Sequence, residues 1–143
     1  MSTPSSGLPT HEPTITPDTA PYWNGLAEGV IRLPHCGSCD ALVWYPRPIC
    51  PGCGNAELEW RELSGRGTVY SYSIARRTPG SWGKVVPYVL AYVELDEGPR
   101  VMTNIVAADL DTLECGQPVT AIFDPTAEGM AVLRFQQIGT TGA

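Results

Sequence analysis

The feature that most constrains this chain is a set of four cysteines arranged as two Cys-x2-Cys pairs. Cys36 and Cys39 form the first pair, Cys50 and Cys53 form the second, and ten residues separate the two pairs. Two such turns can place four thiolates around one metal ion. Zn²⁺ prefers a closed set of four sulfur ligands, so the pattern predicts a structural zinc site.

Other uses of the four cysteines are disulfides, a redox pair and iron. Disulfides need an oxidising compartment, and residues 1–20 hold Ser, Thr and Pro in place of the apolar stretch of a secretory signal. A thioredoxin-like pair opens a helix, which Pro51 and Gly54 disfavour. The run Cys50-Pro51-Gly52-Cys53-Gly54 also resembles a rubredoxin knuckle. We therefore expect Zn²⁺ as the structural cofactor and keep iron as the alternative.

Catalytic chemistry is not expected at this metal. A closed four-sulfur site leaves no coordination position for a substrate. His35 adjoins Cys36 and is expected to be a bystander or an outer partner of the site. Cys115 stands alone in a turn-like sequence with no evident base beside it. We predict no catalytic residue in this chain.

The charge of the chain restricts its partners. Nine Lys and Arg residues against fifteen Asp and Glu residues give a net charge of −6 and a pI near 4.7. Because nucleic-acid binders gain most of their affinity by neutralising phosphates, this sign argues against DNA or RNA. No apolar run approaches the roughly 18 residues that a membrane helix needs, so we expect a cytoplasmic protein with no membrane partner.

One helix is predicted before the cysteines. Residues 19–30 place Tyr22 and Trp23 among apolar residues at helical spacing. These two aromatic side chains pack into the core of this chain or dock onto a partner protein, and the sequence favours neither use. Residues 1–18 are rich in Pro, Thr and Ser and predict a disordered leader.

The sequence after the helix predicts a zinc ribbon followed by a barrel, which makes the chain mainly β. The cysteine pairs alternate with strands, as in a zinc ribbon: one before the first pair, a short one over 41–45 and a half-exposed one over 57–63. Five further strands, with one helical turn between the third and the fourth, fit a Greek-key barrel of the OB type. The strands are predicted over residues 67–75, 88–95, 101–106, 119–123 and 130–136, and the turn over 109–113.

These patterns divide the chain into five parts. We predict a disordered leader, an N-terminal helix with its lead-in, a zinc ribbon, an OB-fold and a flexible tail. Their expected boundaries are 1–18, 19–34, 35–63, 64–138 and 139–143.

One loop of the predicted barrel combines cations with an aromatic ring. It contains Arg76, Arg77, Trp82 and Lys84 and links the first two barrel strands, where OB-folds often bind ligands. Arg or Lys beside an aromatic ring suits a ligand that carries phosphates and an aromatic base. The loop is either a mobile solvated segment or a ligand contact, and the sequence leaves both open.

The order of the motifs resembles one known family. The relevant motifs are the cysteine pairs, Pro46-Arg47-Pro48-Ile49-Cys50-Pro51, Ser64-Gly65-Arg66-Gly67-Thr68-Val69-Tyr70-Ser71, and Pro87-Tyr88-Val89. Over residues 20–138 the chain resembles bacterial and archaeal proteins that join a rubredoxin-like zinc ribbon to an OB-fold. Members of this family accompany thiolase-superfamily enzymes that act on acyl-CoA thioesters, including aldolases that cleave steroid side chains.

The resemblance implies a non-catalytic accessory subunit. Such a subunit stabilises a thiolase-like partner that performs aldol, retro-aldol or Claisen-type chemistry, and it shapes the acyl-CoA site, with steroid side-chain degradation as one branch. The functional interpretation that the resemblance gives to the loop with Arg76, Arg77, Trp82 and Lys84 is a contact to CoA or its acyl chain at the subunit interface. A two-plus-two hetero-oligomer is expected, because thiolase-like enzymes are commonly dimers. Two alternatives stay open: a free-standing acyl-CoA-binding carrier, and a ribbon and OB module that binds single-stranded nucleic acid.

Overall fold

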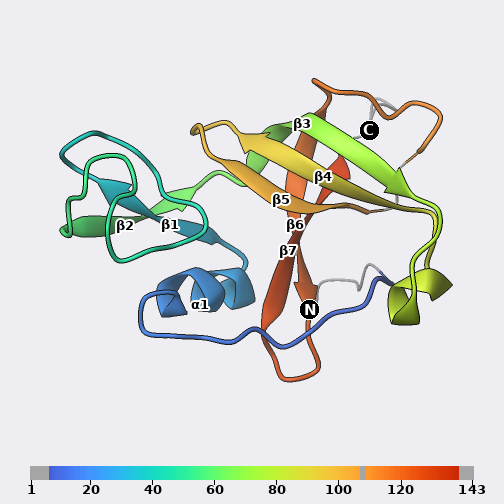
Figure 1. Ribbon diagram of the computed structural model, residues 1–143, viewed down its shortest axis with the longest axis horizontal. Coiled ribbons are helices and arrows are strands. Elements are labelled where there is room, and N and C mark those ends of the chain that lie inside the picture. The colour runs from blue at the N-terminus through green and yellow to red at the C-terminus, as the bar shows by residue number, and fades with distance from the viewer. Residues whose placement is uncertain (1–6, 107–108, 139–143) are drawn as a thin grey trace.

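Five strands close into a barrel in the order β3-β4-β5-β7-β6 in the computed structural model, which describes residues 7–106 and 109–138 (Figure 1). Neighbouring strands are antiparallel except β5 and β7, which pair in parallel at Ile105 and Phe135. This order is that of an OB-fold, so the predicted barrel is confirmed. The strands are β3 (Arg66–Ala75), β4 (Tyr88–Leu95), β5 (Arg100–Ile105), β6 (Pro118–Pro125) and β7 (Ala131–Gln137).

A two-stranded antiparallel sheet and one helix precede the barrel. The sheet consists of β1 (Ile31–Cys36) and β2 (Leu58–Leu63), which pair along their whole lengths. Helix α1 (Ala20–Glu28) contacts β1 and also β6 and β7, so it joins the sheet to the barrel (Figure 1). A 3-10 helix that the sequence did not predict, η1 (Gly80–Lys84), interrupts the loop between β3 and β4.

The predicted helix is confirmed, and its end has a local cause. Gly29 adopts a left-handed conformation with φ of 86°, and its N–H bonds to the carbonyls of the last helical turn. Glycine accepts this conformation without a clash from Cβ. Among the described residues, no helix has both the length and the apolar character that crossing a membrane requires.

The sheet and the barrel share one core. Leu26 of α1 and Leu33 of β1 are fully buried in the same cluster of side chains as Phe135 of β7. The barrel strands contribute every second residue to this cluster, because side chains alternate between the two faces of a strand. We therefore expect a substitution that destabilises the ribbon to lower the stability of the barrel as well, and the reverse.

The ribbon differs from the sequence prediction at two strands. The strand expected before the first cysteine pair is β1, for which no bounds were predicted, and it crosses the expected boundary between residues 34 and 35. Over 41–45 the structure has only an isolated bridge between His35 and Leu42 in place of a strand. Pro46 and Pro48 follow directly, and they remove the backbone donors that a longer strand would need.

Residues 7–18 lie against the barrel, although their composition predicts disorder. The guanidinium of Arg134 donates a hydrogen bond to the carbonyl of Pro9 (2.6 Å). The carboxylate of Glu12 accepts hydrogen bonds from the Thr126 hydroxyl (2.8 Å) and the Glu128 N–H (3.2 Å). Composition gives no sign of such contacts, because they need one carbonyl and one carboxylate and little apolar burial. The remainder of the leader and the predicted tail, residues 1–6 and 139–143, lie outside the described residues.

Gly67 marks a close approach between β3 and β4. A Cβ atom at this position would lie 2.5 Å from the carbonyl oxygen of Glu94 and 2.8 Å from Cγ1 of Val93. We expect Gly67→Ala to lower the free energy of unfolding by about 1–3 kcal/mol, because the neighbouring strand must move. Urea denaturation followed by circular dichroism measures the change.

The matched control for this variant is Ser73→Ala, at an exposed position of the same strand. It should change the free energy of unfolding by less than about 0.5 kcal/mol. Equal stability of Gly67→Ala and the unmodified chain would show that β3 and β4 can shift apart with no loss in the free energy of unfolding.

Candidate functional site

The four predicted cysteine ligands converge beside the end of β1. Their sulfur atoms all lie within 4.8 Å of one another, with Cys36 to Cys53 and Cys39 to Cys50 each at 3.5 Å. A tetrahedron with Zn–S bonds of roughly 2.3 Å has sulfur–sulfur edges of about 3.8 Å. The observed separations fit that geometry and exceed the roughly 2.05 Å of a disulfide bond. The donor set is therefore suited to one closed structural zinc ion.

The two cysteine pairs sit on equivalent turns. The N–H of Asp40 bonds to the carbonyl of Cys36, and the N–H of Gly54 bonds to the carbonyl of Cys50, both at 2.8 Å. Asp40 and Gly54 are also the positions with left-handed backbones, with φ of 66° and 81°. The same local geometry repeated twice brings the two pairs of sulfurs face to face.

Backbone N–H groups favour the thiolate at the first cysteine of each pair. The N–H of Cys39 contributes most to lowering the pKa of Cys36 to about 6, and the Asn55 side-chain amide, 3.6 Å from that sulfur, acts in the same direction. The N–H of Cys53 is the main cause that lowers the pKa of Cys50. These donors stabilise negative charge before any metal is counted.

The second cysteine of the first pair shows why the cluster needs a cation. The N–H of Ala41 lowers the pKa of Cys39, but hydrogen bonding to the sulfurs of Cys50 and Cys36 outweighs it and raises that pKa to about 12. Thiols this close oppose one another's ionisation. A bound Zn²⁺ removes this opposition, because a coordinating thiol is deprotonated outright.

His35 and Cys115 occupy the positions expected of residues outside the metal ligand set. His35 is buried, and its Nε2 lies 2.5 Å from Oδ1 of Asp40, the left-handed residue of the first turn. It thus supports the turn that carries Cys36 and Cys39. Cys115 is an exposed free thiol in the turn before β6.

The metal identity can be measured directly. We expect the chain purified from its native host to contain one zinc ion per chain and no visible colour, because four converging sulfurs suit zinc. Elemental analysis by mass spectrometry is the measurement. A red protein with one iron per chain would instead establish the rubredoxin-type alternative.

The aromatic residues of α1 pack mainly within the chain. Tyr22 is 4% exposed, and its burial raises the pKa of its hydroxyl to about 12. Trp44 donates a hydrogen bond to that hydroxyl at 3.4 Å. Trp23 is half-buried and donates from Nε1 to the hydroxyl of Tyr45 at 2.8 Å. This placement favours the packing role for Tyr22 and leaves Trp23, beside the exposed ring of Tyr45, as the residue still open to a partner.

The predicted cationic loop encloses a hollow against the barrel. Trp82 of η1 packs on Tyr88 at the start of β4, with ring centres 4.7 Å apart. The hydroxyls of Thr78 and Tyr88 are 3.1 Å apart. These three side chains, with Leu90 and Asn104, line a hollow of about 210 Å³. The loop is therefore partly structured, although a mobile segment was one of the two interpretations that its sequence allowed.

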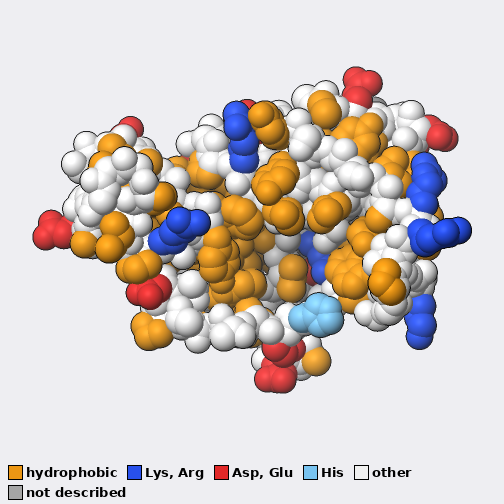
Figure 2. Space-filling view, in the orientation of Figure 1, with side chains coloured by type: hydrophobic (Ala, Val, Ile, Leu, Met, Phe, Trp, Pro, Cys, Tyr) orange, Lys and Arg blue, Asp and Glu red, His pale blue; other side chains and the backbone are white. Residues whose placement is uncertain are grey.

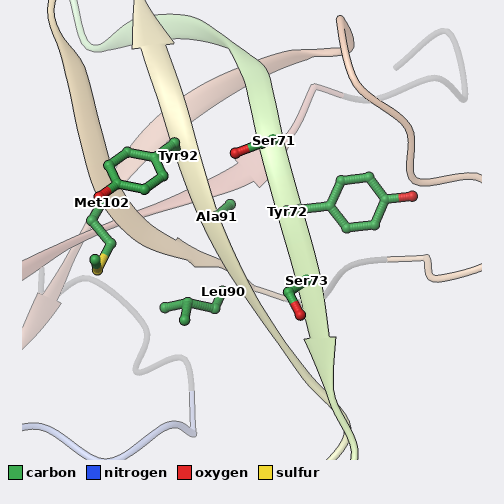
Figure 3. Close-up of a pocket in the computed structure, with 7 residues that line it drawn as sticks. All are labelled: Ser71, Tyr72, Ser73, Leu90, Ala91, Tyr92 and Met102. Carbon is green, nitrogen blue, oxygen red and sulfur yellow. The ribbon is translucent and has the colours of Figure 1, made fainter.

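A second hollow of about 200 Å³ adjoins the first at Leu90 (Figure 3). It is lined by residues of β3, β4 and β5, and its exposed large apolar side chains are Leu90 and Tyr92 of β4 and Met102 of β5. These three side chains are 45%, 41% and 48% exposed, which is unusual for large apolar residues clustered together. We call the two hollows together the β4 groove, lined by Thr78, Trp82, Tyr88, Leu90, Tyr92 and Met102.

One end of the β4 groove is cationic. Arg76 and Arg77 directly precede Thr78, and Lys84 lies two residues after Trp82. All three cations are exposed, and none forms an ion pair with any residue that the structure describes. Figure 2 shows Lys and Arg side chains gathered at the right-hand end, where Figure 1 places η1. The structure thus brings the four predicted loop residues to one end of a groove, and their role as ligand or interface residues stays a prediction.

Most of the groove was not predicted. Tyr88, Leu90, Asn104, Tyr92 and Met102 come from strands that the sequence assigned to the barrel without a surface role. The available signal was the nearly continuous apolar run over 88–95, which indicates apolar side chains on both faces of a strand.

Two family models match the chain. Residues 23–59 match the rubredoxin-like zinc ribbon domain of ChsH2, and residues 60–124 match its C-terminal OB-fold domain. This chain belongs to the ChsH2 family of zinc-ribbon and OB-fold proteins. The zinc ribbon is thus supported both by the family and by the converging sulfurs.

Similar proteins have names that refer to subunits and scaffolds. A probable enoyl-CoA hydratase alpha subunit of Thermomonospora curvata is 37% identical over 75% of this chain, which spans only 33% of that relative's length. A DUF35 domain-containing scaffold protein of Methanothermobacter thermautotrophicus is 37% identical over 65% of this chain and 71% of its own length. The benzoylsuccinyl-CoA thiolase subunit BbsA of Geobacter metallireducens is 33% identical over 73% of this chain and 64% of its own length.

One solved chain is similar to this protein over nearly its whole length. A chain of the Ltp2-ChsH2(DUF35) aldolase superposes with a TM-score of 0.77 at 32% identity, covering 88% of this chain and 98% of that one. The ribbon, helix and barrel therefore recur together in a protein of an aldolase assembly.

Proposed function

We propose that this chain is a non-catalytic accessory subunit of a thiolase-like enzyme that acts on acyl-CoA thioesters. The observation that carries the proposal is the match to a chain of the Ltp2-ChsH2(DUF35) aldolase over 98% of that chain. The relative named as a thiolase subunit supports the same class of partner. The partner supplies the residues for aldol, retro-aldol or Claisen-type chemistry, and steroid side-chain cleavage is one branch of it.

The arrangement of reactive side chains in this chain supports an accessory role. Carbon–carbon bond chemistry on a thioester needs a nucleophile or a base that reaches the substrate. Four of the five cysteines converge as metal ligands, and the imidazole of His35 is buried against Asp40. The proposal places the protein in the cytoplasm, where thiols stay reduced and bind zinc, and in a two-plus-two assembly with a dimeric partner.

Affinity purification from the native host tests the proposal. A tagged chain, washed at high salt, should retain a thiolase-fold protein in about equal amount, because an obligate interface is largely apolar and resists salt. Mass spectrometry names the partner, and light scattering gives the stoichiometry. Recovery of the chain without a protein partner would overturn the accessory role.

One observation favours a second function, that of a free-standing acyl-CoA carrier. The β4 groove lies entirely on this chain and needs no second subunit to form its cationic and apolar ends. A carrier binds acyl-CoA when purified alone and is recovered without a thiolase-fold protein. The purification above and a ligand titration therefore separate the two functions.

A further inference from the structure

We propose that the docking of residues 7–12 on the barrel controls the order of the η1 loop, residues 76–87 between β3 and β4. We call residues 7–12 the strap. One side chain, that of Arg134 on β7, contacts both the strap and the η1 loop and carries the effect from one to the other. A partner that draws the strap away from the barrel therefore loosens the loop as well. The inference concerns this chain alone and does not depend on the proposed function.

The turn between β6 and β7 holds the carboxylate of the strap in a preformed site. The Thr126 side chain is 7% exposed, and its oxygen accepts a hydrogen bond from the Met130 N–H at 3.1 Å. The hydroxyl proton is left for Glu12, whose Oε1 lies 2.8 Å away. The second oxygen of that carboxylate accepts a hydrogen bond from the Glu128 N–H at 3.2 Å. Hydrogen bonds to an ionised carboxylate are stronger than those between neutral groups, so this turn anchors one end of the strap.

Arg134 provides the second anchor and joins three parts of the fold. Its Nη1 donates to Oδ2 of Asp124 on β6, and its Nη2 donates to the carbonyl of Pro9 in the strap at 2.6 Å. The guanidinium carbon lies 5.7 Å from the ring centre of Trp82 in η1, which is within the range of a cation–π contact. A guanidinium is planar and rigid, so acceptors on two of its nitrogens also fix its position beside the ring.

The η1 loop depends on few contacts, and Trp82 makes several of them. No residue of η1 is buried. Trp82 packs on Tyr88 with ring centres 4.7 Å apart, and its carbonyl accepts a hydrogen bond from the Val85 N–H at 3.2 Å. A segment with few buried contacts opens locally at a low free energy. Displacement of Arg134 from the ring is therefore enough to raise the open fraction of the loop.

The strap is also held by few contacts, which makes it releasable. None of its residues is buried, whereas Leu26 of the following helix is fully buried in the core. Docking of the strap thus gains little from apolar burial and depends on the polar contacts of Pro9 and Glu12. Figure 1 shows this part of the chain running from the side of η1 along the barrel to α1. We expect the barrel to stay folded when the strap leaves it.

Amide hydrogen exchange of the zinc-loaded full chain, measured by nuclear magnetic resonance, tests the proposal. The Glu128 N–H bonds to the Glu12 carboxylate and reports the docking of the strap. The Val85 N–H bonds within the η1 loop and reports the order of that loop. The Val69 N–H bonds to a backbone carbonyl at the buried side of β3 and reports the barrel.

Glu12→Ala removes the anchor at the turn. The Glu128 N–H loses its acceptor and should exchange about tenfold faster. The Val85 N–H should exchange about two- to fivefold faster, because a larger fraction of chains has a free strap. The rate at Val69 should stay unchanged. Asp18→Ala is the matched control, because it removes an exposed carboxylate that forms no ion pair with the described residues, and it should alter none of the three rates.

The reverse experiment separates coupling from a local effect. Coupling between two sites is reciprocal, so a change in the loop must also loosen the strap. Trp82→Leu removes the ring beside Arg134 and should make the Glu128 N–H exchange about two- to fivefold faster, although Glu12 is intact. Tyr92→Leu is the matched control, because it removes an exposed ring from β4 and should leave the exchange at Glu128 unchanged.

Three results would overturn the proposal. The first is an unchanged rate at Val85 in Glu12→Ala, which would make the strap a local contact with no effect on the loop. The second is an equal rise at all three amides, which would make the strap a stabiliser of the whole fold. The third is an unchanged rate at Glu128 in Trp82→Leu. Since the isolated chain is measured, these results leave the proposed function standing, and failure to capture a partner leaves the coupling standing.

Discussion

Cys50→Ser is expected to abolish metal binding and unfold the ribbon. The thiol it removes is 1% exposed and lies 3.5 Å from the sulfur of Cys39, so a hydroxyl leaves the tetrahedron with three sulfurs. Outside β1 and β2, residues 37–57 have little regular structure to hold them when the metal leaves. In small metal-binding domains the free energy of metal binding is also folding free energy. We therefore expect metal content to fall from one ion per chain to nearly none.

Two measurements on the same samples check this result. Elemental analysis gives the metal content, and amide spectra show whether the signals of residues 31–63 collapse. Cys115→Ser is the matched control, because it removes an exposed thiol outside the cluster and should keep both metal and spectrum. A Cys50→Ser chain with no metal and an intact ribbon spectrum would contradict the structural role. Because Leu33 packs in the barrel core, the melting temperature of the whole chain should fall as well.

Asp124→Asn is the second change with a large expected effect. Asp124 is fully buried, and its carboxylate lies 2.5 Å from the guanidinium of Arg134, which is 3% exposed. Burial already lowers the pKa of Arg134, because desolvation disfavours its charged form. Loss of the carboxylate charge removes the negative charge beside this buried cation, and we expect the free energy of unfolding to fall by about 3–5 kcal/mol.

An exposed ion pair provides the control for this variant. Glu94→Gln breaks the pair between Glu94 and Arg100, whose side chains are 41% and 51% exposed. Such pairs contribute about 0–1 kcal/mol, so urea denaturation should barely distinguish this variant from the unmodified chain. A similar small loss for Asp124→Asn would mean that water reaches the buried pair and screens it.

The metal site and the barrel could be predicted from the sequence because their signals are local. Two residues between cysteines fix a turn, and alternation over six to eight residues fixes a strand. The bounds of β1 could not be predicted because Pro34 lies inside it, and a proline argues against a strand in sequence reasoning. The hydrogen-bonded partner of β1 begins more than twenty residues later, beyond the range of any local pattern.

The groove could not be predicted because the sequence does not show which way a strand faces. The apolar run over 88–95 predicted a central strand with both faces covered. In the structure Val89 and Ala91 point into the barrel, whereas Leu90 and Tyr92 are left on its outer face. The sequence pattern is the same whether an outward apolar residue is exposed or is covered by a second layer. Only the closed barrel shows that no second layer of the described residues lies there.

Closure of the barrel also limits how a partner protein can hold it. Each barrel strand has a hydrogen-bonded neighbour on both sides, and closure runs through Ile105 and Phe135 with the N–H of Val106 bonded to the Phe135 carbonyl at 2.8 Å. Where these pairings close the barrel, a visiting chain finds no free strand edge to extend. Recognition at the closed part of the barrel has to be encoded in side chains, so single substitutions there can change partner choice while the fold stays intact.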